Sequence, residues 1–218
     1  MQENKYWYLS SYPKSGNTWC RFFLHELTRL SDIKQNNHFH LDNINLNQPL
    51  STGRIISNRE WLDDQIGINS SELTDSEIET IRPNIHNQSF PEERTLRFYK
   101  IHDAFSIANK NHKKIISTKN CNGIVYLIRN PLDIAVSMES FFGWSKNQCI
   151  NFLLDSNAKI STLTEGRSSQ LPQYLGTWDH HVTSWTNQKN VPLLVFLVLI
   201  SLFAFSFQIA PFLILLPL

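Results

Sequence analysis

Apolar and polar positions along the chain alternate between short runs typical of strands and longer stretches with helical spacing. The aromatic run at residues 6–9 suits a buried strand, and the β-branched run at residues 123–128 suits a central strand of a parallel sheet. Apolar residues recur at helical spacing after the first run: Trp19, Phe22, Phe23, Leu27 and Leu30. Ile134, Ala135 and Met138 give the stretch after the second run an apolar side. This order of strands and helices predicts an α/β fold.

Two later segments extend this pattern. Residues 98–101 form a short run that predicts another strand. Trp178, Val182 and Trp185 fall on one face of a predicted helix, and residues 191–195 would begin the strand that follows it.

The intervening stretch at residues 31–95 is rich in Asn, Ser and Gln and predicts loops with short helices. Residues 74–77, Thr-Asp-Ser-Glu, form a capping box that marks one helix start, and Pro83 is predicted to close that helix. Trp61, Leu62 and Ile66 predict another short amphipathic turn.

The composition fits a single domain of ordinary size. The chain has 218 residues and a formal net charge of +1, so bulk binding to nucleic acid is not expected. Cys20, Cys121 and Cys149 are scattered, which suits a reducing compartment better than a disulfide framework. Residues 1–5 lack the apolar core of a signal peptide, so a cytoplasmic location is expected.

The most informative segment is the octapeptide at residues 12–19, which links the first strand to the first helix. Pro13 is predicted to stop the strand, Gly16 permits a tight turn, and Thr18 can begin the helix. A helix start favours an anion, and Lys14 adds a positive charge beside it. An ordinary turn with a surface lysine remains open at this point. The lysine precedes the glycine, unlike the Walker order G-x-x-x-x-G-K-[ST], which argues against a P-loop kinase or Mg²⁺-nucleotide hydrolase.

A second candidate segment follows the strand at residues 123–128. Asn130 is a good helix cap and Pro131 suits the first helical position. Arg129 at the strand end and Ser137 in the helix would both face a ligand at the carboxyl edge of the sheet. An arginine fork suits a phosphate, although a solvated strand-end arginine is an equally open interpretation of this segment alone.

Together these segments resemble the PAPS-dependent sulfotransferase family. Residues 12–19, Tyr-Pro-Lys-Ser-Gly-Asn-Thr-Trp, are similar to its 5′-phosphosulfate loop, Tyr-Pro-Lys-Ser-Gly-Thr/Asn-Thr-Trp. Residues 129–137 resemble its 3′-phosphate motif, R-[DN]-P-x-D-x-x-[VL]-S, and residues 176–185 resemble its helix G-x-W-x-x-H-V-x-x-W. The resemblance covers roughly residues 5–195. It implies a P-loop-type three-layer fold in which helices flank a central parallel sheet.

The same resemblance singles out one histidine. The family carries a Lys-x-His segment between its two phosphate motifs, and its histidine is the general base; Lys100 and His102 match that segment. A structural role is the more ordinary expectation for the other histidines: His25, His38, His40, His86, His112, His180 and His181.

The implied reaction moves a sulfuryl group from 3′-phosphoadenosine-5′-phosphosulfate (PAPS) to a hydroxyl or amine. His102 would take the acceptor proton, Lys14 would neutralise the leaving phosphate oxygen, and Lys100 would hold sulfuryl oxygens or be a strand-edge lysine. Arg129 and Ser137 would bind the 3′-phosphate. The 5′-phosphate loop would comprise Lys14, Ser15, Gly16, Asn17, Thr18 and Trp19. Trp19 would stack on the adenine or pack in the core.

Partners follow from this reaction only in part. The acceptor would be a small molecule, a glycan or a lipid, with its pocket formed by variable loops in residues 31–95. The aromatic residues Phe141, Phe142 and Trp144 would line an apolar acceptor pocket or simply pack together. No metal is implied, because no zinc-type Cys/His cluster occurs. The sequence predicts no oligomeric state.

The chain departs from the family after Val195. The family continues with an Arg/Phe-Tyr-Glu-Asp segment and a closing Arg-Lys-Gly loop on the 3′-phosphate, whereas residues 190–218 here are uncharged and mostly apolar. We therefore expect an incomplete sulfotransferase domain at residues 5–195 and an apolar tail at residues 196–218. The tail is either a membrane anchor or the product of a frameshift or truncation. The second interpretation is favoured because the change falls inside an expected strand.

Because of this departure, a protein without full enzymatic activity is an alternative interpretation. A missing clamp loop predicts weak PAPS binding, and an apolar tail beside an exposed sheet edge predicts aggregation or membrane association. The alternative is a catalytically impaired remnant, or a membrane-associated nucleotide-binding protein.

Overall fold

The computed structural model describes residues 6–36, 55–88, 97–110, 113–161 and 169–198. The helices are α1 (Asn17–Asn36), α2 (Arg59–Ile66), η2 (Ser70–Glu72), α3 (Asp75–Gln88), η3 (Ala108–Lys110), α4 (Pro131–Phe142), α5 (Lys146–Leu154) and α6 (Trp178–Thr186). The strands are β1 (Tyr6–Ser11), β2 (Arg97–Ile101), β3 (Ser106–Ile107), β4 (Lys113–Lys114), β5 (Gly123–Arg129), β6 (Lys159–Ile160), β7 (Gln173–Tyr174) and β8 (Leu193–Val198).

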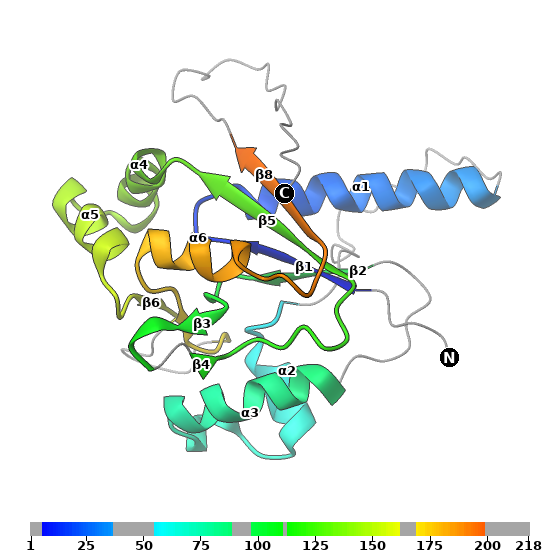
Figure 1. Ribbon diagram of the computed structural model, residues 1–218, viewed down its shortest axis with the longest axis horizontal. Coiled ribbons are helices and arrows are strands. Elements are labelled where there is room, and N and C mark those ends of the chain that lie inside the picture. The colour runs from blue at the N-terminus through cyan, green and yellow to red at the C-terminus, as the bar shows by residue number, and fades with distance from the viewer. Residues whose placement is uncertain (1–5, 37–54, 89–96, 111–112, 162–168, 199–218) are drawn as a thin grey trace.

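A parallel sheet with the strand order β2-β1-β5-β8 forms the centre of the described fold (Figure 1). Ser10 of β1 lies beside Ile101 of β2 on one side and Tyr126 of β5 on the other. Because the pairing is parallel throughout, the carboxyl ends of these strands meet at one edge. The predicted α/β fold with flanking helices is confirmed.

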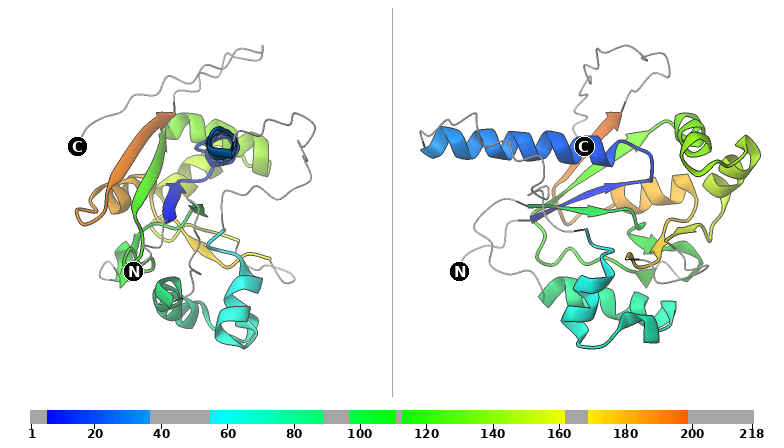
Figure 2. Two further views of the ribbon diagram at one scale, coloured as in Figure 1. Left: turned by 90° about the vertical axis from the view of Figure 1, so that its right-hand side faces the viewer. Right: turned by 180° about the vertical axis from the view of Figure 1, so that it is seen from behind.

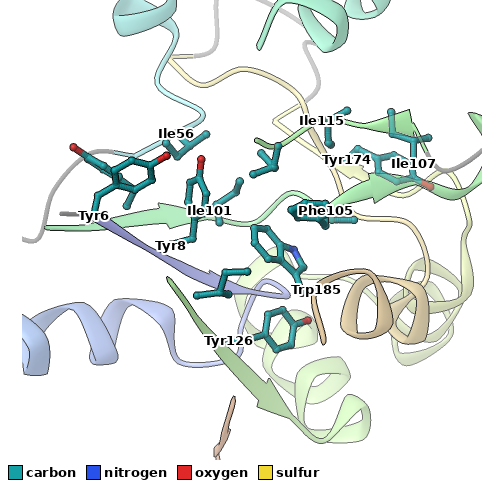
Figure 3. Packing of buried hydrophobic residues seen from close by; sticks show 14 residues of the cluster. Tyr6, Tyr8, Ile56, Ile101, Phe105, Ile107, Ile115, Tyr126, Tyr174 and Trp185 are labelled. Carbon is teal, nitrogen blue, oxygen red and sulfur yellow. The ribbon is translucent and has the colours of Figure 1, made fainter. Parts of the chain in front are cut away.

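The two faces of the sheet are covered by different helices. On one face, Leu9 and Val125 pack with Cys20 and Leu24 of α1. On the other face, Tyr8 and Tyr126 pack with Trp185 of α6, as Figure 3 shows. Helix α6 therefore lies in front of the sheet in Figure 1, and α1 lies in front when the molecule is seen from behind in Figure 2. The result is the expected three-layer arrangement.

The remaining helices form two smaller units. Helices α4 and α5 pack on each other through Ile134, Met138, Cys149 and Leu153. Helices α2 and α3 form a separate cluster below the β2 edge, with these buried residues: Trp61, Leu62, Ile78, Ile85 and Leu171. The predicted capping box is present, because Thr74 Oγ1 accepts from the Glu77 N–H and Glu77 Oε2 accepts from the Thr74 N–H at 2.8 Å.

Three local expectations were wrong. Helix α3 does not end at Pro83 but continues to Gln88. Ile78 before the proline and Ile85 after it both pack in the same cluster, and this burial offsets the missing hydrogen bond. Helix α1 begins at Asn17 rather than Thr18, and β8 begins at Leu193 rather than at residue 191.

The apolar residues that recur at helical spacing in α1 do not face the sheet. Trp19, Phe22, Phe23 and Leu27 are 46–55% exposed. Cys20 and Leu24 make the contact with the sheet instead. The side chain of Leu30 lies outside the described residues.

The predicted tail begins inside the sheet. Its first residues, 196–198, belong to β8 and pair with Leu127, Ile128 and Arg129 of β5. Residues 199–218 lie outside the described part of the chain, so the proposed anchor and frameshift interpretations stay predictions. Among the helices that the structure describes, none combines the length and apolarity that a membrane crossing requires.

A buried ion pair joins α3 to the segment that follows β2. Arg82 donates to both carboxylate oxygens of Asp103, at 3.1 and 2.9 Å, and both side chains are almost fully buried. Asp103 Oδ1 also accepts from the backbone N–H of Tyr174 at 3.0 Å. Good geometry and extra hydrogen bonds are what make a buried pair tolerable, so removing one partner leaves an uncompensated charge.

We expect Asp103→Ala to lower the free energy of unfolding by about 3–5 kcal/mol, because Arg82 would stay buried without its partner. The matched control is Asp75→Ala. Asp75 pairs with Lys159 at 3.0 Å, but its side chain is 53% exposed. Its loss should change stability by about 1 kcal/mol or less. Urea unfolding followed by circular dichroism measures both, and equal losses would contradict the assigned role of the buried pair.

Candidate active site

The loop between β1 and α1 lies at the carboxyl edge of the sheet, where the sequence predicted it. The backbone takes positive φ at Lys14 (68°) and at Gly16 (89°). A lysine rarely adopts this conformation, and such strain is concentrated at functional sites. The turn brings the first N–H groups of α1, which have no intrahelical partners, to the same edge. The loop therefore has the geometry of an anion-binding cradle.

Buried polar atoms under the loop have no partner within the described residues. Ser15 is 1% exposed, and its Oγ makes no hydrogen bond there. Asn17 donates to the Leu9 carbonyl at 3.3 Å and to Ser11 Oγ at 3.2 Å, while its Oδ1 stays unpaired in the same part of the chain. Unpaired buried polar atoms are uncommon in folded proteins and mark places where a ligand or water completes the bonding.

Arg129 connects the end of β5 to this loop. Its guanidinium donates to the Lys14 carbonyl at 2.8 Å, and its Nε is buried with no partner in the described structure. Asn130 caps α4 by accepting from the Leu132 N–H at 2.9 Å, and Pro131 occupies the first helical turn as predicted. The two predicted phosphate segments are thus in direct contact.

Lys14 points toward α4. Its ammonium lies 3.7 Å from the centre of the Phe141 ring, a cation–π contact. Partial burial, and next the positive charge of Arg129, lower the pKa of Lys14. Because Lys14 is partly desolvated and lies near the positive charge of Arg129, an anion bound between them would stabilise its charged form.

His102 follows β2, the neighbour of β1 in the sheet. Its Nδ1 lies 2.8 Å from the Ser11 carbonyl oxygen, which can only accept, so Nδ1 carries the proton. Nε2 therefore keeps its lone pair, and within the described residues nothing bonds to it. Burial, followed by the charge of Lys100, lowers the pKa of His102 from 6.5 to about 3. The imidazole is neutral at physiological pH.

Lys100 and Arg21 add positive charge beside His102. Burial, and next the charge of Arg21, lower the pKa of Lys100 to about 8. Arg21 stands one turn after Asn17 on α1, and its Nε is buried without a partner in the described structure. Sequence reasoning missed Arg21; its position four residues after Asn17, on the helix that follows the loop, was the available signal.

The other predicted site residues, Ser137, Thr18 and Trp19, make no side-chain hydrogen bond to the residues described above. Ser137 is half-buried on α4 and makes no hydrogen bond among the described residues. Thr18 is exposed at the start of α1. Trp19 stacks on Phe23, with ring centres 5.7 Å apart and planes 4° from parallel, and its side chain is 46% exposed. Trp19 is thus not a core residue here.

Two groups of predicted residues result. Lys14 and Arg129 meet at the loop, while His102 and Lys100 stand at the end of β2; Asn17 and Ser11 connect the groups through the end of β1. His, Cys, Asp and Glu side chains nowhere gather in threes that would hold a metal ion in the described ranges. The chemistry of the edge is basic and suited to anions.

Comparison with known proteins gives a single assignment. No curated protein matches the chain. The family model described as "Sulfotransferase domain" matches residues 6–198, which include the loop, His102, Arg129 and α6. The chain therefore belongs to the sulfotransferase family.

Proposed function

We propose that this chain transfers a sulfuryl group from PAPS to a hydroxyl or amine acceptor. The observation that carries the proposal is the carboxyl edge of the sheet. Basic side chains converge there with buried polar atoms that have no partner among the described residues, and the neutral His102 keeps the lone pair of Nε2 beside them. Family membership supports the transfer of a sulfuryl group, and the edge supplies the chemistry that such a donor requires.

The loop residues fit the phosphates of PAPS. Ser15 Oγ and the first N–H groups of α1 would bond the 5′-phosphate, since both lack partners in the described structure. Arg129 Nε, which is buried and has no partner in the part of the chain that the structure describes, would bond the 3′-phosphate together with Ser137. The open face of Trp19 would stack on the adenine.

His102 would act as the general base. The bond from its Nδ1–H to the Ser11 carbonyl fixes the tautomer, so that Nε2 can take the proton of an acceptor hydroxyl. A pKa of about 3 makes it a weak base in the free protein, mainly because of burial and then of Lys100. Negative charge from a bound nucleotide would offset the charge of Lys100 and raise this pKa.

Lys14 and Lys100 would complete the site. When PAPS is bound, the bond between sulfur and the 5′-phosphate oxygen breaks as the acceptor oxygen bonds to sulfur. Lys14 would donate to the phosphate oxygen that leaves, and its flexible stem allows it to swing there from Phe141. Lys100 would hold the sulfuryl oxygens.

The acceptor proposed is a small molecule, glycan or lipid with an apolar part. Phe141 and Phe142 are exposed on α4, and Phe142 stacks on Trp144 with ring centres 4.6 Å apart. Phe141 also touches Lys14, so an apolar acceptor on these rings would lie close to the reacting group. The alternative is a nucleotide-binding protein without turnover, which differs only in the outcome of an acceptor screen.

We expect 3′-phosphoadenosine-5′-phosphate to bind the chain without Mg²⁺. Lys14→Ala and Arg129→Ala should each weaken binding by about 10- to 100-fold, the effect of losing one charge-assisted hydrogen bond. The control is Lys119→Ala, which removes the same charge from an exposed site before β5, at the opposite edge of the sheet. Calorimetry measures all four proteins. Equal affinity in all of them would contradict the proposed nucleotide site.

We also expect the same nucleotide to raise the pKa of His102 above its value of about 3 in the free chain. Phosphate charge favours the protonated imidazole, so the shift must be upward. The ¹⁵N shifts of the His102 ring, titrated with and without nucleotide, measure it. A pKa that is unchanged or lowered would show that the phosphates bind elsewhere.

A further inference from the structure

Four side chains of helix α6 bond to backbone groups of the segment that begins with His102. These hydrogen bonds are 2.8–3.1 Å long. The pairs are His181 Nε2 with the His102 carbonyl, Trp185 Nε1 with the Asp103 carbonyl, Ser184 Oγ with the Phe105 N–H, and His180 Nε2 with the Ser106 carbonyl. The proposed mechanism uses none of these α6 residues.

The bond to His102 has a fixed direction. The His102 carbonyl can only accept, so His181 Nε2 carries the proton and donates it at 2.8 Å. His181 Nδ1 then has a lone pair, and the Tyr126 hydroxyl donates to it at 2.7 Å. The rings of His181 and Tyr126 are fully buried. Burial lowers the pKa of His181 to about 4, so its imidazole is neutral.

His102 is consequently held by both its ring and its backbone. The ring is bonded to Ser11 at the end of β1, and the carbonyl is bonded through His181 to Tyr126 on β5. Tyr126 pairs with Ser10 in the sheet register, so both attachments lead back to the same two central strands. Such doubly fixed groups keep the orientation that proton transfer requires.

We propose that His181, with its tautomer set by Tyr126, is a positioning residue that holds His102 in the orientation in which Nε2 faces the acceptor. The inference rests on the proposed role of His102 as base. It assigns a function to His181, which composition and spacing left as an ordinary core histidine.

The test replaces the donor at position 181 in the full 218-residue chain. His181→Phe keeps an aromatic ring but has no N–H, whereas His181→Gln keeps an N–H donor and an acceptor for Tyr126. Tyr126→Phe is a milder second variant should His181→Phe not fold. Tyr8→Phe is the matched control, because Tyr8 is equally buried and donates to the Ser117 carbonyl at 2.8 Å, away from His102.

The first measurement is the tautomer of His102 from its ¹⁵N ring shifts at neutral pH, which does not depend on turnover. In His181→Phe a displaced His102 ring would lose its bond to the Ser11 carbonyl, so we expect mixed tautomers. We expect a smaller change in Tyr126→Phe, and wild-type shifts in His181→Gln and Tyr8→Phe. Unchanged His102 shifts in both His181→Phe and Tyr126→Phe would overturn the inference.

The second measurement is turnover with PAPS and a simple phenol. His181→Phe should lower kcat by about tenfold with little change in the KM for PAPS, and His181→Gln should restore most of it. An equal fall in Tyr8→Phe would mean that only stability was lost, and would contradict positioning. His102→Gln separates the two proposals. If it leaves turnover unchanged, His102 is not the base, while the ring shifts still decide whether His181 orients it.

Discussion

The parallel pairing of β1 with strands on both sides is the constraint on which the rest of the site depends. Parallel strands end at the same edge, so β1 delivers its loop beside the ends of β2 and β5. Ser11, the last residue of β1, accepts from the ring of His102 after β2, while the Lys14 carbonyl accepts from Arg129, the last residue of β5. Residues about 90 to 115 positions apart in the chain are thereby bonded through a six-residue strand.

The two faces of the sheet differ in how the helices cover them. The α6 face is tightly packed, and the α1 face leaves large side chains exposed. Trp185 and its aromatic neighbours bury the α6 face, where side-chain bonds run into the segment after β2. The α1 face is covered by smaller residues, Cys20 and Leu24, and leaves the larger rings of α1 exposed. The proposed base His102 thus rests on a fully packed face, while the surface next to the loop proposed to bind the nucleotide is exposed.

Local sequence patterns were enough to locate the loop, the four strands of the central sheet and the caps of α3 and α4. Pro13, Gly16, Asn130 and Pro131 each act within a few residues, so their effect is readable without the fold. The family resemblance assigned Lys14 and Arg129 to two separate phosphate motifs, and the structure brings the Arg129 guanidinium into contact with the Lys14 carbonyl.

Other features depend on contacts between distant residues and were not readable. Continuation of α3 through Pro83 depends on burial of Ile85 against α2, and the role of Asp103 depends on Arg82. The exposed apolar side chains of α1 are a further example, since helical spacing of apolar residues does not say what lies opposite them. His181 looked like any core histidine until its partners were known.

Because His102 and His181 stay neutral in the folded chain, folding releases protons when the pH is below the pKa of an unfolded histidine. An unfolded histidine titrates near 6.5, whereas His181 and His102 titrate near 4 and 3 in the folded chain. Below pH 6.5 the unfolded chain therefore holds protons that the folded chain lacks, and each histidine withdraws up to about 1.4 kcal/mol of stability per pH unit until its folded pKa is reached. The same burial that keeps the imidazoles neutral therefore makes the folded domain less stable as the pH falls below the ordinary histidine pKa.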